Sequence, residues 1–316
     1  MKSLFFPCHM CGSYDSEMLT PAYLANGSFC KFQQIVICRK CGLVYKNPVI
    51  PELNTISYSK ISWGNGTIFK KRISSLALFL SELLKEIPPK TIMEIGPGPG
   101  WLAMSLQDLF PTSKYILLEA SKDVAELTKR NLPNATVIPA TIDEAYINND
   151  FADLALVCGV DYLFPDFRRA IEKMHKLLTI NGYLYIERNV FVESEAYVGF
   201  PIKSYKDLFG ANVLMTTWFA VDQYKQFLTL FFDIVSEKSF FHDETDGFKC
   251  IINGFLCKKK VIRSEYYDGS TSWYEANMAS LCRLNKESNN PISTNAKLQI
   301  VATKLWNTFQ CWRLHK

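Results

Sequence analysis

The fold is decided by residues 91–100, which read TIMEIGPGPG. The first five residues are a short apolar run of the kind found in buried strands. Glycines at alternate positions follow them, and residues 101–110 continue with apolar side chains at helical spacing. A strand, a glycine-rich loop and a helix in this order predict the first unit of an open parallel sheet. The ligand site of such a sheet lies at the carboxyl ends of its strands.

Strand-like and helix-like segments alternate on both sides of this unit, which is the pattern of an α/β fold. Further strands are expected at 115–118, 136–139, 154–157 and 182–186, with helices at 68–84, 121–131, 166–178 and 222–231. A hairpin of residues 234–241 and 250–256 closes the pattern. We therefore predict a doubly wound, seven-stranded, Rossmann-like sheet over residues 68–260.

The glycine loop allows a ligand to approach the backbone closely. A dinucleotide fingerprint requires a glycine where Trp101 stands, and no Gly-Lys-Ser/Thr follows as in a phosphate-binding loop. Glu94, two residues before Gly96, would repel a pyrophosphate but suits a ligand that carries an ammonium group. A Gly-Pro turn without any ligand is the alternative.

Glu119 ends the second predicted strand, 19 residues after Gly100. A carboxylate at this position accepts hydrogen bonds from both hydroxyls of a ribose, and charge-assisted bonds of this kind are worth about 1.5–3 kcal/mol. The alternative is an ordinary solvated charge at the end of a strand. Together with the glycine loop, Glu119 favours a ligand that contains a nucleoside.

Two Cys-x-x-Cys-Gly sequences begin at Cys8 and Cys38, with 26 residues between the second cysteine of one and the first of the other. Four thiolates at this spacing predict a closed, tetrahedral and therefore structural zinc site. The expected zinc ribbon spans residues 1–51, contains short strands at 35–37 and 43–45, and binds the metal through Cys8, Cys11, Cys38 and Cys41. A ligand role for His9 or Cys30, and disulfide pairing of the cysteines, are the alternatives.

From the glycine loop to the strand at 182–186, the chain resembles the class I S-adenosylmethionine-dependent methyltransferases. The resemblance also covers residues 151–154 (FADL), which are similar to the start of that family's fourth strand. Ala140-Thr141-Ile142 stands where the family usually has Gly-Asp-Ala, so threonine replaces the aspartate. The resemblance implies that the loop holds the methionine end of the cofactor, that Glu119 holds the ribose, and that residues 141–142 contact adenine. The implied cofactor-binding residues are Glu94, Gly96, Pro97, Gly98, Gly100, Glu119, Ala120, Thr141, Ile142 and Gly159.

The N-terminal region is similar to that of bacterial zinc-ribbon C-methyltransferases of sugar and natural-product biosynthesis. The matching residues are Cys11-Gly12-Ser13, Cys41-Gly42-Leu43-Val44, Asn47-Pro48, Tyr58-Ser59 and Ser62. In that group the last of these lie in a segment that covers the cofactor, and residues 52–67 are expected to do so here. The chain departs from the group because only 56 residues follow residue 260, where the group has a third domain, and because residues 212–215 replace its Tyr-His-Glu-His. The resemblance implies methyl transfer to a small-molecule biosynthetic intermediate.

The methyl acceptor is expected near the carboxyl ends of the fourth and fifth strands. Asp161 and Tyr162 follow the fourth strand, Glu187 ends the fifth, and His242 lies in the charged loop of the final hairpin. We predict Asp161, Tyr162 and His242 as catalytic residues that orient or deprotonate the acceptor. An ordinary surface position is the alternative for each of them.

Composition limits the remaining possibilities. The 316 residues are 48% hydrophobic and 21% charged, which excludes a disordered chain. No apolar stretch approaches the roughly 20 residues of a membrane-spanning helix, and no signal peptide opens the chain, so we expect a cytoplasmic protein. Residues 261–316 form a C-terminal tail, in which Leu298 to Trp312 have helical spacing. This tail is expected to pack on its own domain or on a second copy of the chain, with a membrane-surface helix as the alternative.

Two rival functions stay open. An RNA base methyltransferase would grip RNA with the ribbon, but the net charge of +4 is small, and the ribbon offers only a modest set of candidates: Lys31, Arg39, Lys40, Tyr45 and Lys46. A non-catalytic binding protein with the same fold would have a blocked cofactor site, and the glycines of the loop together with Glu119 argue against it.

Overall fold

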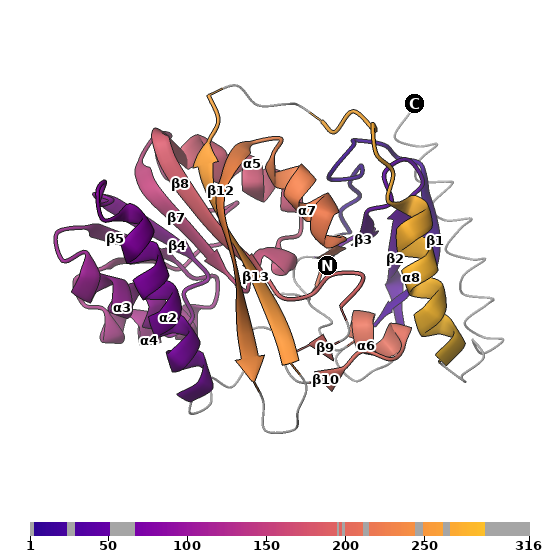
Figure 1. Cartoon of the computed structure of the whole chain (residues 1–316), viewed down its shortest axis with the longest axis horizontal. Coiled ribbons are helices and arrows are strands. Elements are labelled where there is room, and N and C mark those ends of the chain that lie inside the picture. The colour runs from indigo at the N-terminus through magenta and orange to yellow at the C-terminus, as the bar shows by residue number, and fades with distance from the viewer. Residues whose placement is uncertain are drawn as a thin grey trace.

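The computed structural model describes residues 3–23, 29–50, 67–194, 196–197, 200–210, 215–243, 249–261 and 266–287. A seven-stranded sheet with the order β12-β13-β8-β7-β4-β5-β6 dominates the fold. Helices lie on both sides of this sheet, and a four-stranded sheet stands beside them (Figure 1). The predicted α/β, Rossmann-like fold is confirmed.

The parallel part of the large sheet contains the glycine-loop strand. β4 (Thr91–Ile95) pairs with β5 (Lys114–Leu118) on one side and with β7 (Ala152–Cys158) on the other. β6 (Thr136–Ile138) and β8 (Leu178–Arg188) extend the sheet in the same direction. The carboxyl ends of these five strands therefore meet at one edge.

The predicted hairpin completes the sheet next to β8. β13 (Lys249–Lys259) pairs antiparallel both with β8 and with β12 (Phe232–Asp243). β12 consequently runs parallel to β8, on the far side of β13. Both strands are longer than the sequence pattern predicts.

Each face of the sheet is covered by helices that bury apolar side chains. On one face, Leu76 and Leu80 of the helix that precedes β4 and Leu106 of the helix that follows it pack on the strands. On the other face, Phe167, Ile171 and Phe227 belong to the main core. The helices are α2 (Thr67–Leu84), α3 (Trp101–Leu109) and α4 (Lys122–Asn131) on the first side and α5 (Phe167–Leu177) and α7 (Val221–Leu228) on the second (Figure 1).

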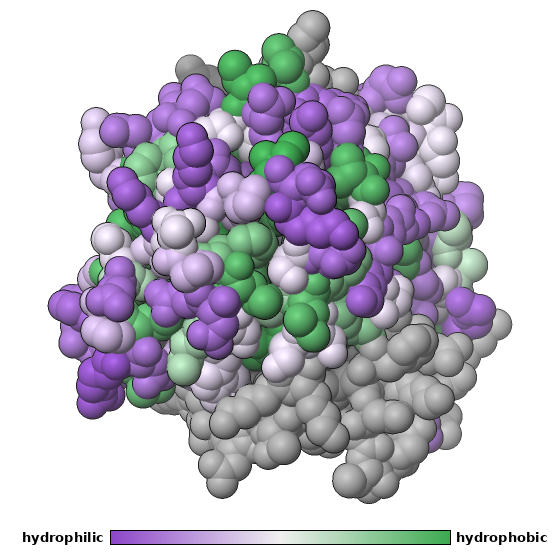
Figure 2. Space-filling view, turned by 60° about the vertical axis from the view of Figure 1, so that its left-hand side comes forward, coloured by the Kyte–Doolittle hydropathy of each residue, from purple (hydrophilic) through white to green (hydrophobic). Residues whose placement is uncertain are grey.

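The surface on the side of α2 to α4 is mixed in character. Figure 2 shows hydrophilic side chains over most of the described part of this side, with hydrophobic ones scattered between them. Leu78 of α2 and Met104 of α3 are among the exposed hydrophobic residues. No helix among the described residues is long and apolar enough to cross a membrane.

The cysteine-rich region forms the four-stranded sheet, in the order β1-β2-β3-β11. Three of its strands come from the N-terminal region: β1 (Ser16–Tyr23), β2 (Phe29–Cys38) and β3 (Val44–Lys46). The fourth, β11 (Thr217–Trp218), comes from beyond β8 and pairs antiparallel with β3. The sheet of the ribbon therefore includes a segment outside the predicted range of 1–51.

Later helices also pack on this sheet. Phe209 of α6 (Tyr205–Gly210) and Leu281 of α8 (Tyr274–Glu287) lie in one core cluster with Ile35 and Val44. The side chain of Asn277 in α8 donates a hydrogen bond to the carbonyl of Gly42 at 2.9 Å. Part of the predicted C-terminal tail is thus a helix on the ribbon sheet.

Several expected features differ from the structure or fall beyond it. The sequence analysis predicts no strand at β1, which contains Pro21 and forms at an edge of the ribbon sheet, where proline is tolerated. Apart from Thr67, the expected covering segment 52–67 lies outside the described residues, and so does the helix expected from 298 to 312. A short turn, η1 (Asp161–Leu163), follows β7, and β9 (Ala196–Tyr197) pairs with β10 (Phe200–Pro201).

Candidate functional site

A cavity of about 510 Å³ lies at the carboxyl ends of β4 to β7. It contains both apolar and ionisable side chains, and it includes residues from the N-terminal arm that precedes Cys8. The described residues that line it are Leu4, Phe6, Ile95, Gly96, Leu118, Glu119, Ala120, Ala140, Thr141, Ile142, Asp143, Glu144, Val160, Leu163, Phe164, Pro165, Asp166 and Arg169. Five of the predicted cofactor-binding residues are among them: Gly96, Glu119, Ala120, Thr141 and Ile142.

The glycine loop has the backbone that its sequence predicts. Gly96, Gly98 and Gly100 have φ angles of 67°, 56° and 84°, in the left-handed region that favours glycine. A Cβ added to Gly96 would lie 2.8 Å from Cγ1 of Val160, and both residues line the cavity. The loop thus brings its backbone to the cavity wall without an obstructing side chain.

The other residues of the loop lie behind this wall. The carbonyl of Gly98 accepts a hydrogen bond from the Thr128 hydroxyl of α4, and the carbonyl of Pro97 accepts one from the N–H of Gly100 at 3.0 Å. Gly159 also has a left-handed φ of 69°, and a Cβ there would meet nothing within 4 Å.

Glu119 brings to the cavity a carboxylate of which only one oxygen accepts a hydrogen bond from the described residues. Oε1 accepts the N–H of Ser121 at 2.9 Å, whereas Oε2 is buried and has no partner among the described residues. Burial raises the pKa of Glu119 to about 7. A buried acceptor without a partner costs free energy, so the site is suited to a ligand that donates hydroxyl hydrogens to Oε2.

Glu94 is buried just behind the loop rather than in the cavity wall. Burial raises its pKa to about 8; the N–H of Ala103 in the first turn of α3 favours the charged form, while the carboxylates of Glu119 and Glu187 oppose it. Its Oε2 has no partner among the described residues. Glu94 therefore connects the strand before the loop to the helix after it.

In the segment predicted to contact adenine, the polar groups of Thr141 bond to a neighbouring residue of the same segment. Ile142 is buried in the cavity wall, but the N–H and the hydroxyl of Thr141 both donate to the Glu144 carboxylate, at 3.1 and 2.9 Å. The sequence analysis missed Asp143, which lines the cavity. Its Oδ1 has no hydrogen-bond partner within the described part of the chain and lies 3.4 Å from Nε of Arg169. Burial raises the pKa of Asp143. The sequence contained a signal for Asp143, because it is an acidic residue directly after residues 141–142, which were expected to contact adenine.

The four predicted metal ligands come together. The Sγ atoms of Cys8, Cys11, Cys38 and Cys41 all lie within 4.8 Å of one another and are buried. None of them is in a disulfide. Gly12 and Gly42 have left-handed φ angles of 70° and 79°, and their N–H groups bond to the carbonyls of Cys8 and Cys38. This donor set fits a tetrahedral Zn²⁺.

The two alternative ligands lie elsewhere. The Nδ1 atom of His9 points to Asp166 at 3.4 Å, and Cys30 is buried in a separate core cluster with Ile35 and Trp218. Neither belongs to the group of close sulfur atoms.

Two of the predicted catalytic residues, Asp161 and Tyr162, are buried side chains outside the cavity lining. Asp161 is completely buried and accepts hydrogen bonds from Nε of Arg188 at 2.7 Å and from the hydroxyl of Tyr224 at 2.9 Å. Burial raises its pKa, although both partners favour the charged form. Tyr162 is buried in the core cluster beneath the ribbon sheet. Neither residue lines the cavity; of His242 the structure gives only its place in β12, opposite Cys250.

Arg188 explains why Asp161 turns inward. The guanidinium donates to the carbonyl and hydroxyl of Thr217 at 3.0 and 2.9 Å, and it lies over the rings of Phe167, Phe219 and Tyr224 at 5.0 to 5.3 Å. Asp161 is the carboxylate that neutralises this buried cation. The pair joins η1, and hence the cavity wall at Val160, to β8 and β11.

Asp161→Asn is expected to lower the free energy of unfolding by about 3–5 kcal/mol, because it leaves the Arg188 charge buried without a counter-ion. Denaturant unfolding monitored by circular dichroism measures the loss. Asp233→Asn is the control, since Asp233 is exposed and lies 3.6 Å from Lys260; it should cost less than about 1 kcal/mol. Equal effects of the two substitutions would contradict this role of Asp161.

A second polar cluster lies on the opposite face of β8 and contains Glu187, which the sequence analysis placed near the methyl acceptor. The buried carboxylate of Glu187 accepts hydrogen bonds from Nη1 of Arg72 at 2.5 Å and from the hydroxyl of Tyr185 at 3.0 Å. Arg72 belongs to α2, so the pair ties the start of this helix to the carboxyl end of β8. The pairing of Arg72 with Glu187 is visible only in the structure, where α2 packs on β8, since 115 positions separate the two residues in the sequence.

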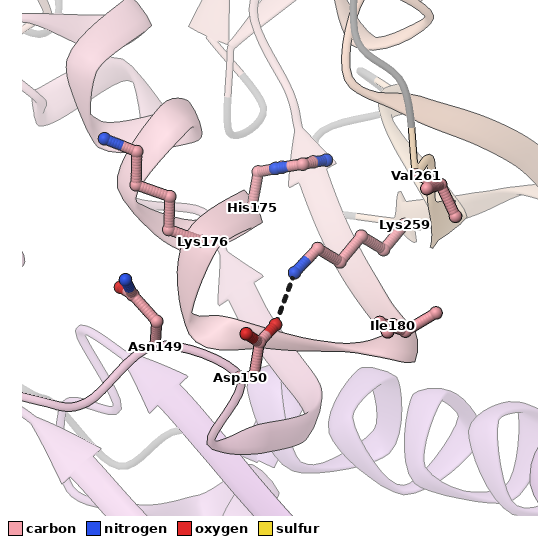
Figure 3. A pocket seen from close by; sticks show the side chains of 7 residues that line it. All are labelled: Asn149, Asp150, His175, Lys176, Ile180, Lys259 and Val261. Atoms are coloured by element: carbon pink, nitrogen blue, oxygen red, sulfur yellow. Dashed lines mark hydrogen bonds and ion pairs between the residues drawn. The ribbon is translucent and has the colours of Figure 1, made fainter.

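A smaller cavity lies at the other end of the strands. Its lining includes Asp150 just before β7, Ile180 near the start of β8 and Lys259 at the end of β13 (Figure 3). Nζ of Lys259 pairs with Asp150 at 2.8 Å. In open α/β sheets, ligands bind at the carboxyl ends, so the larger cavity is the candidate site.

Comparison with known families supports this assignment. A family model described as a methyltransferase domain matches residues 93–186, which include the glycine loop, Glu119 and the segment 141–143. The chain carries a class I S-adenosylmethionine-dependent methyltransferase domain. The match to this methyltransferase domain begins at Met93 in β4, so it leaves out the cysteine-rich region that precedes it.

Solved structures share the fold of the methyltransferase domain. One is an S-adenosylmethionine-dependent methyltransferase of Leishmania major, at 18% identity and a TM-score of 0.50 over 66% of this chain and 82% of that one. Another is the N-methyltransferase NodS of Bradyrhizobium japonicum WM9 with S-adenosyl-L-homocysteine, at 15% identity and a TM-score of 0.48 over 66% of this chain and 98% of that one. The comparison with curated proteins gave no match.

Proposed function

We propose that this methyltransferase acts on a small-molecule biosynthetic intermediate and that its four clustered cysteines hold one structural zinc ion. The observation that carries the methyl-transfer part is Oε2 of Glu119, which has no partner among the described residues and belongs to a cavity whose wall includes Gly96 of the glycine loop. The clustered cysteines carry the zinc part.

The described residues divide into contacts for each part of the cofactor. Glu119 would accept the ribose hydroxyls, and Gly96 would leave space for the methionine portion. Ile142, Leu163 and Phe164 provide apolar surfaces for adenine, and Oδ1 of Asp143 offers an acceptor for its exocyclic amine. Pro97, Gly98, Gly100 and Glu94 act from behind by fixing the loop, and Ala120 and Gly159 complete the site.

When bound, S-adenosylmethionine supplies a methyl group on a sulfonium, which an in-line nucleophile displaces without a covalent enzyme intermediate. The protein then has to hold the acceptor in line and, where the acceptor is a weak nucleophile, to accept its proton. We propose His242 for proton transfer, because β12 carries it to the carboxyl end of the sheet. Asp161, locked to Arg188, is proposed as a positioning residue that holds the turn after Val160, and Tyr162 as its packing partner.

A small-molecule acceptor is favoured over RNA by the burial of two ribbon residues. Tyr45 and Lys46, which would belong to an RNA-gripping face, are both buried. Burial also lowers the pKa of Lys46 to about 7, which weakens it as a phosphate contact. Among the candidate ribbon cations whose side chains the structure describes, Arg39 and Lys40 are exposed, and two cations fall short of a basic RNA-binding surface.

The acceptor class is tested with labelled cofactor. The protein is incubated with methyl-labelled S-adenosylmethionine and either a metabolite extract or total RNA, and the products are identified by mass spectrometry. Label in a small molecule supports the proposal, and label in RNA alone overturns it.

The affinity for S-adenosylhomocysteine is expected to fall as the pH drops below about 7, the pKa of Glu119. The ribose hydroxyls need the carboxylate form of Glu119, and protonation below its pKa of about 7 removes that form. The limiting slope is tenfold per pH unit. Calorimetric titrations between about pH 5 and pH 9 measure the profile.

Glu119→Gln should weaken binding about tenfold at the alkaline end and flatten the profile near pH 7. Any pH dependence of the affinity that Glu119→Gln retains near pH 8 is assigned to Glu94, whose pKa is about 8. Glu126→Gln, at an exposed position of α4, is the matched control and should keep the wild-type profile. An unchanged profile in Glu119→Gln would contradict the ribose assignment.

A further inference from the structure

The N-terminal arm, residues 3–7, reaches the cavity of the methyltransferase domain although it lies more than 80 positions before the glycine loop. Leu4 and Phe6 line the cavity together with Leu163 and Phe164, whereas Phe5 between them does not. This alternation is that of an extended chain, whose successive side chains point to opposite sides. One side of the arm therefore faces the cavity.

Hydrogen bonds hold the arm in this place. Leu4 forms an isolated antiparallel bridge with Val49, with both N–H to carbonyl bonds at 2.8 Å. The Asn47 side chain accepts the N–H of Phe6 at 3.2 Å and donates to its carbonyl at 3.1 Å. Asn47 directly follows β3, so the ribbon sheet positions the side chain that binds the backbone of Phe6.

The first cysteine knuckle continues the arm and docks beside the cavity. The rings of Phe6 and His9 lie 5.7 Å apart, and Nδ1 of His9 lies 3.4 Å from Asp166, which itself lines the cavity. Nη1 of Arg168 donates to the carbonyl of His9 at 3.2 Å. The cysteine cluster and the cavity thus share one continuous set of contacts.

We propose that Leu4 and Phe6 are cofactor-binding residues that close the nucleoside end of the cavity, and that Asn47 is the positioning residue that keeps the arm there. The inference rests on the proposed use of the cavity for S-adenosylmethionine. The nucleoside end is the relevant one, because Leu4 and Phe6 line the cavity with Glu119, the 141–143 segment, Leu163 and Phe164, the proposed nucleoside contacts, whereas only Gly96 stands for the methionine portion. The ribbon thereby acts on cofactor binding and not only on its own fold.

Phe6→Ala tests the proposal with two ligands, S-adenosylhomocysteine and 5′-methylthioadenosine. Both contain the nucleoside, and only the first has the amino-acid portion. The substitution should weaken both by a similar factor of about tenfold, since it removes an apolar contact to the part that they share. A loss confined to S-adenosylhomocysteine, or no loss for either ligand, would overturn the proposal.

Phe5→Ala is the matched control, because this neighbouring phenylalanine does not line the cavity, and it should leave both affinities within about twofold. Zinc content and thermal unfolding of each variant show that the ribbon is intact. If the wild type binds S-adenosylhomocysteine and Glu119→Gln weakens it while Phe6→Ala does not, the inference alone fails. If the wild type does not bind the ligand, the proposed function fails with it.

Asn47→Ala tests the positioning role without touching the cavity. It should weaken both ligands less than Phe6→Ala does, and it should speed hydrogen exchange of the Leu4 and Phe6 amides in the ligand-free protein. In the wild type, S-adenosylhomocysteine should slow exchange of these amides. If S-adenosylhomocysteine does not change the hydrogen-exchange rates of these two amides, a binding role for the arm is contradicted.

Discussion

Gly96→Val is expected to abolish measurable binding of S-adenosylhomocysteine, a loss of at least about a hundredfold. The φ of 67° at this position is a strained conformation for an L side chain, at a cost of roughly 1–3 kcal/mol. The Cβ would also lie 2.8 Å from Cγ1 of Val160, and the remaining methyl groups would fill space at the cavity wall. Calorimetry on the purified variant measures the loss.

Gly269→Val separates this effect from backbone strain in general. Gly269 has an even larger φ of 86°, and a Cβ there would meet only the flexible end of the Lys40 side chain. This variant should bind the ligand with wild-type affinity even if its unfolding temperature falls. Retained binding in Gly96→Val, or equal loss in both variants, would argue against the loop as a ligand site.

Cys38→Ser is expected to remove the zinc ion and to unfold the ribbon sheet. Structural zinc contributes roughly 10–16 kcal/mol to the folding of small zinc-finger peptides, and without it four buried sulfur groups face each other with no common partner. Zinc per chain, measured by elemental mass spectrometry, should fall from one to near zero. Proteolysis should become faster within residues 3–50.

Cys282→Ser is the control for this substitution. Cys282 is exposed on α8 and lies outside the group of four cysteines, so its replacement should leave one zinc per chain and wild-type resistance to protease. Absence of metal from wild-type protein purified without chelator would contradict the zinc proposal. A full zinc content in Cys38→Ser would contradict the assignment of ligands.

The sequence reveals those parts of the site that depend on short-range geometry. Gly96 stands where the chain needs a left-handed φ directly after a buried strand, and that need is visible in the alternating glycines. Glu119 is placed by the end of a strand, and the cysteine knuckles by their spacing of three residues. In each case the residue and its structural requirement lie within a few positions of each other.

The sequence does not reveal where a side chain turns when its partner is distant. Asp161 lies after the predicted strand, but its orientation is decided by Arg188 on the next strand and by Tyr224, 63 residues later. Tyr45 and Lys46 look like surface residues of a ribbon, but both are buried, and Tyr45 packs in the main core against the ring of His9. The cavity residues Leu4 and Phe6 carry no motif, because their role depends on the docking of one unit against another.

The pairing of β11 with β3 also sets an order of events during synthesis. Thr217 leaves the ribosome about 170 residues after Tyr45, which at roughly 5–20 residues per second is a delay of about ten seconds or more. The cysteine knuckles are complete long before that moment and can capture metal while the sheet that surrounds them still has an open edge. The nascent ribbon therefore exposes the edge of β3 until β11 has been made.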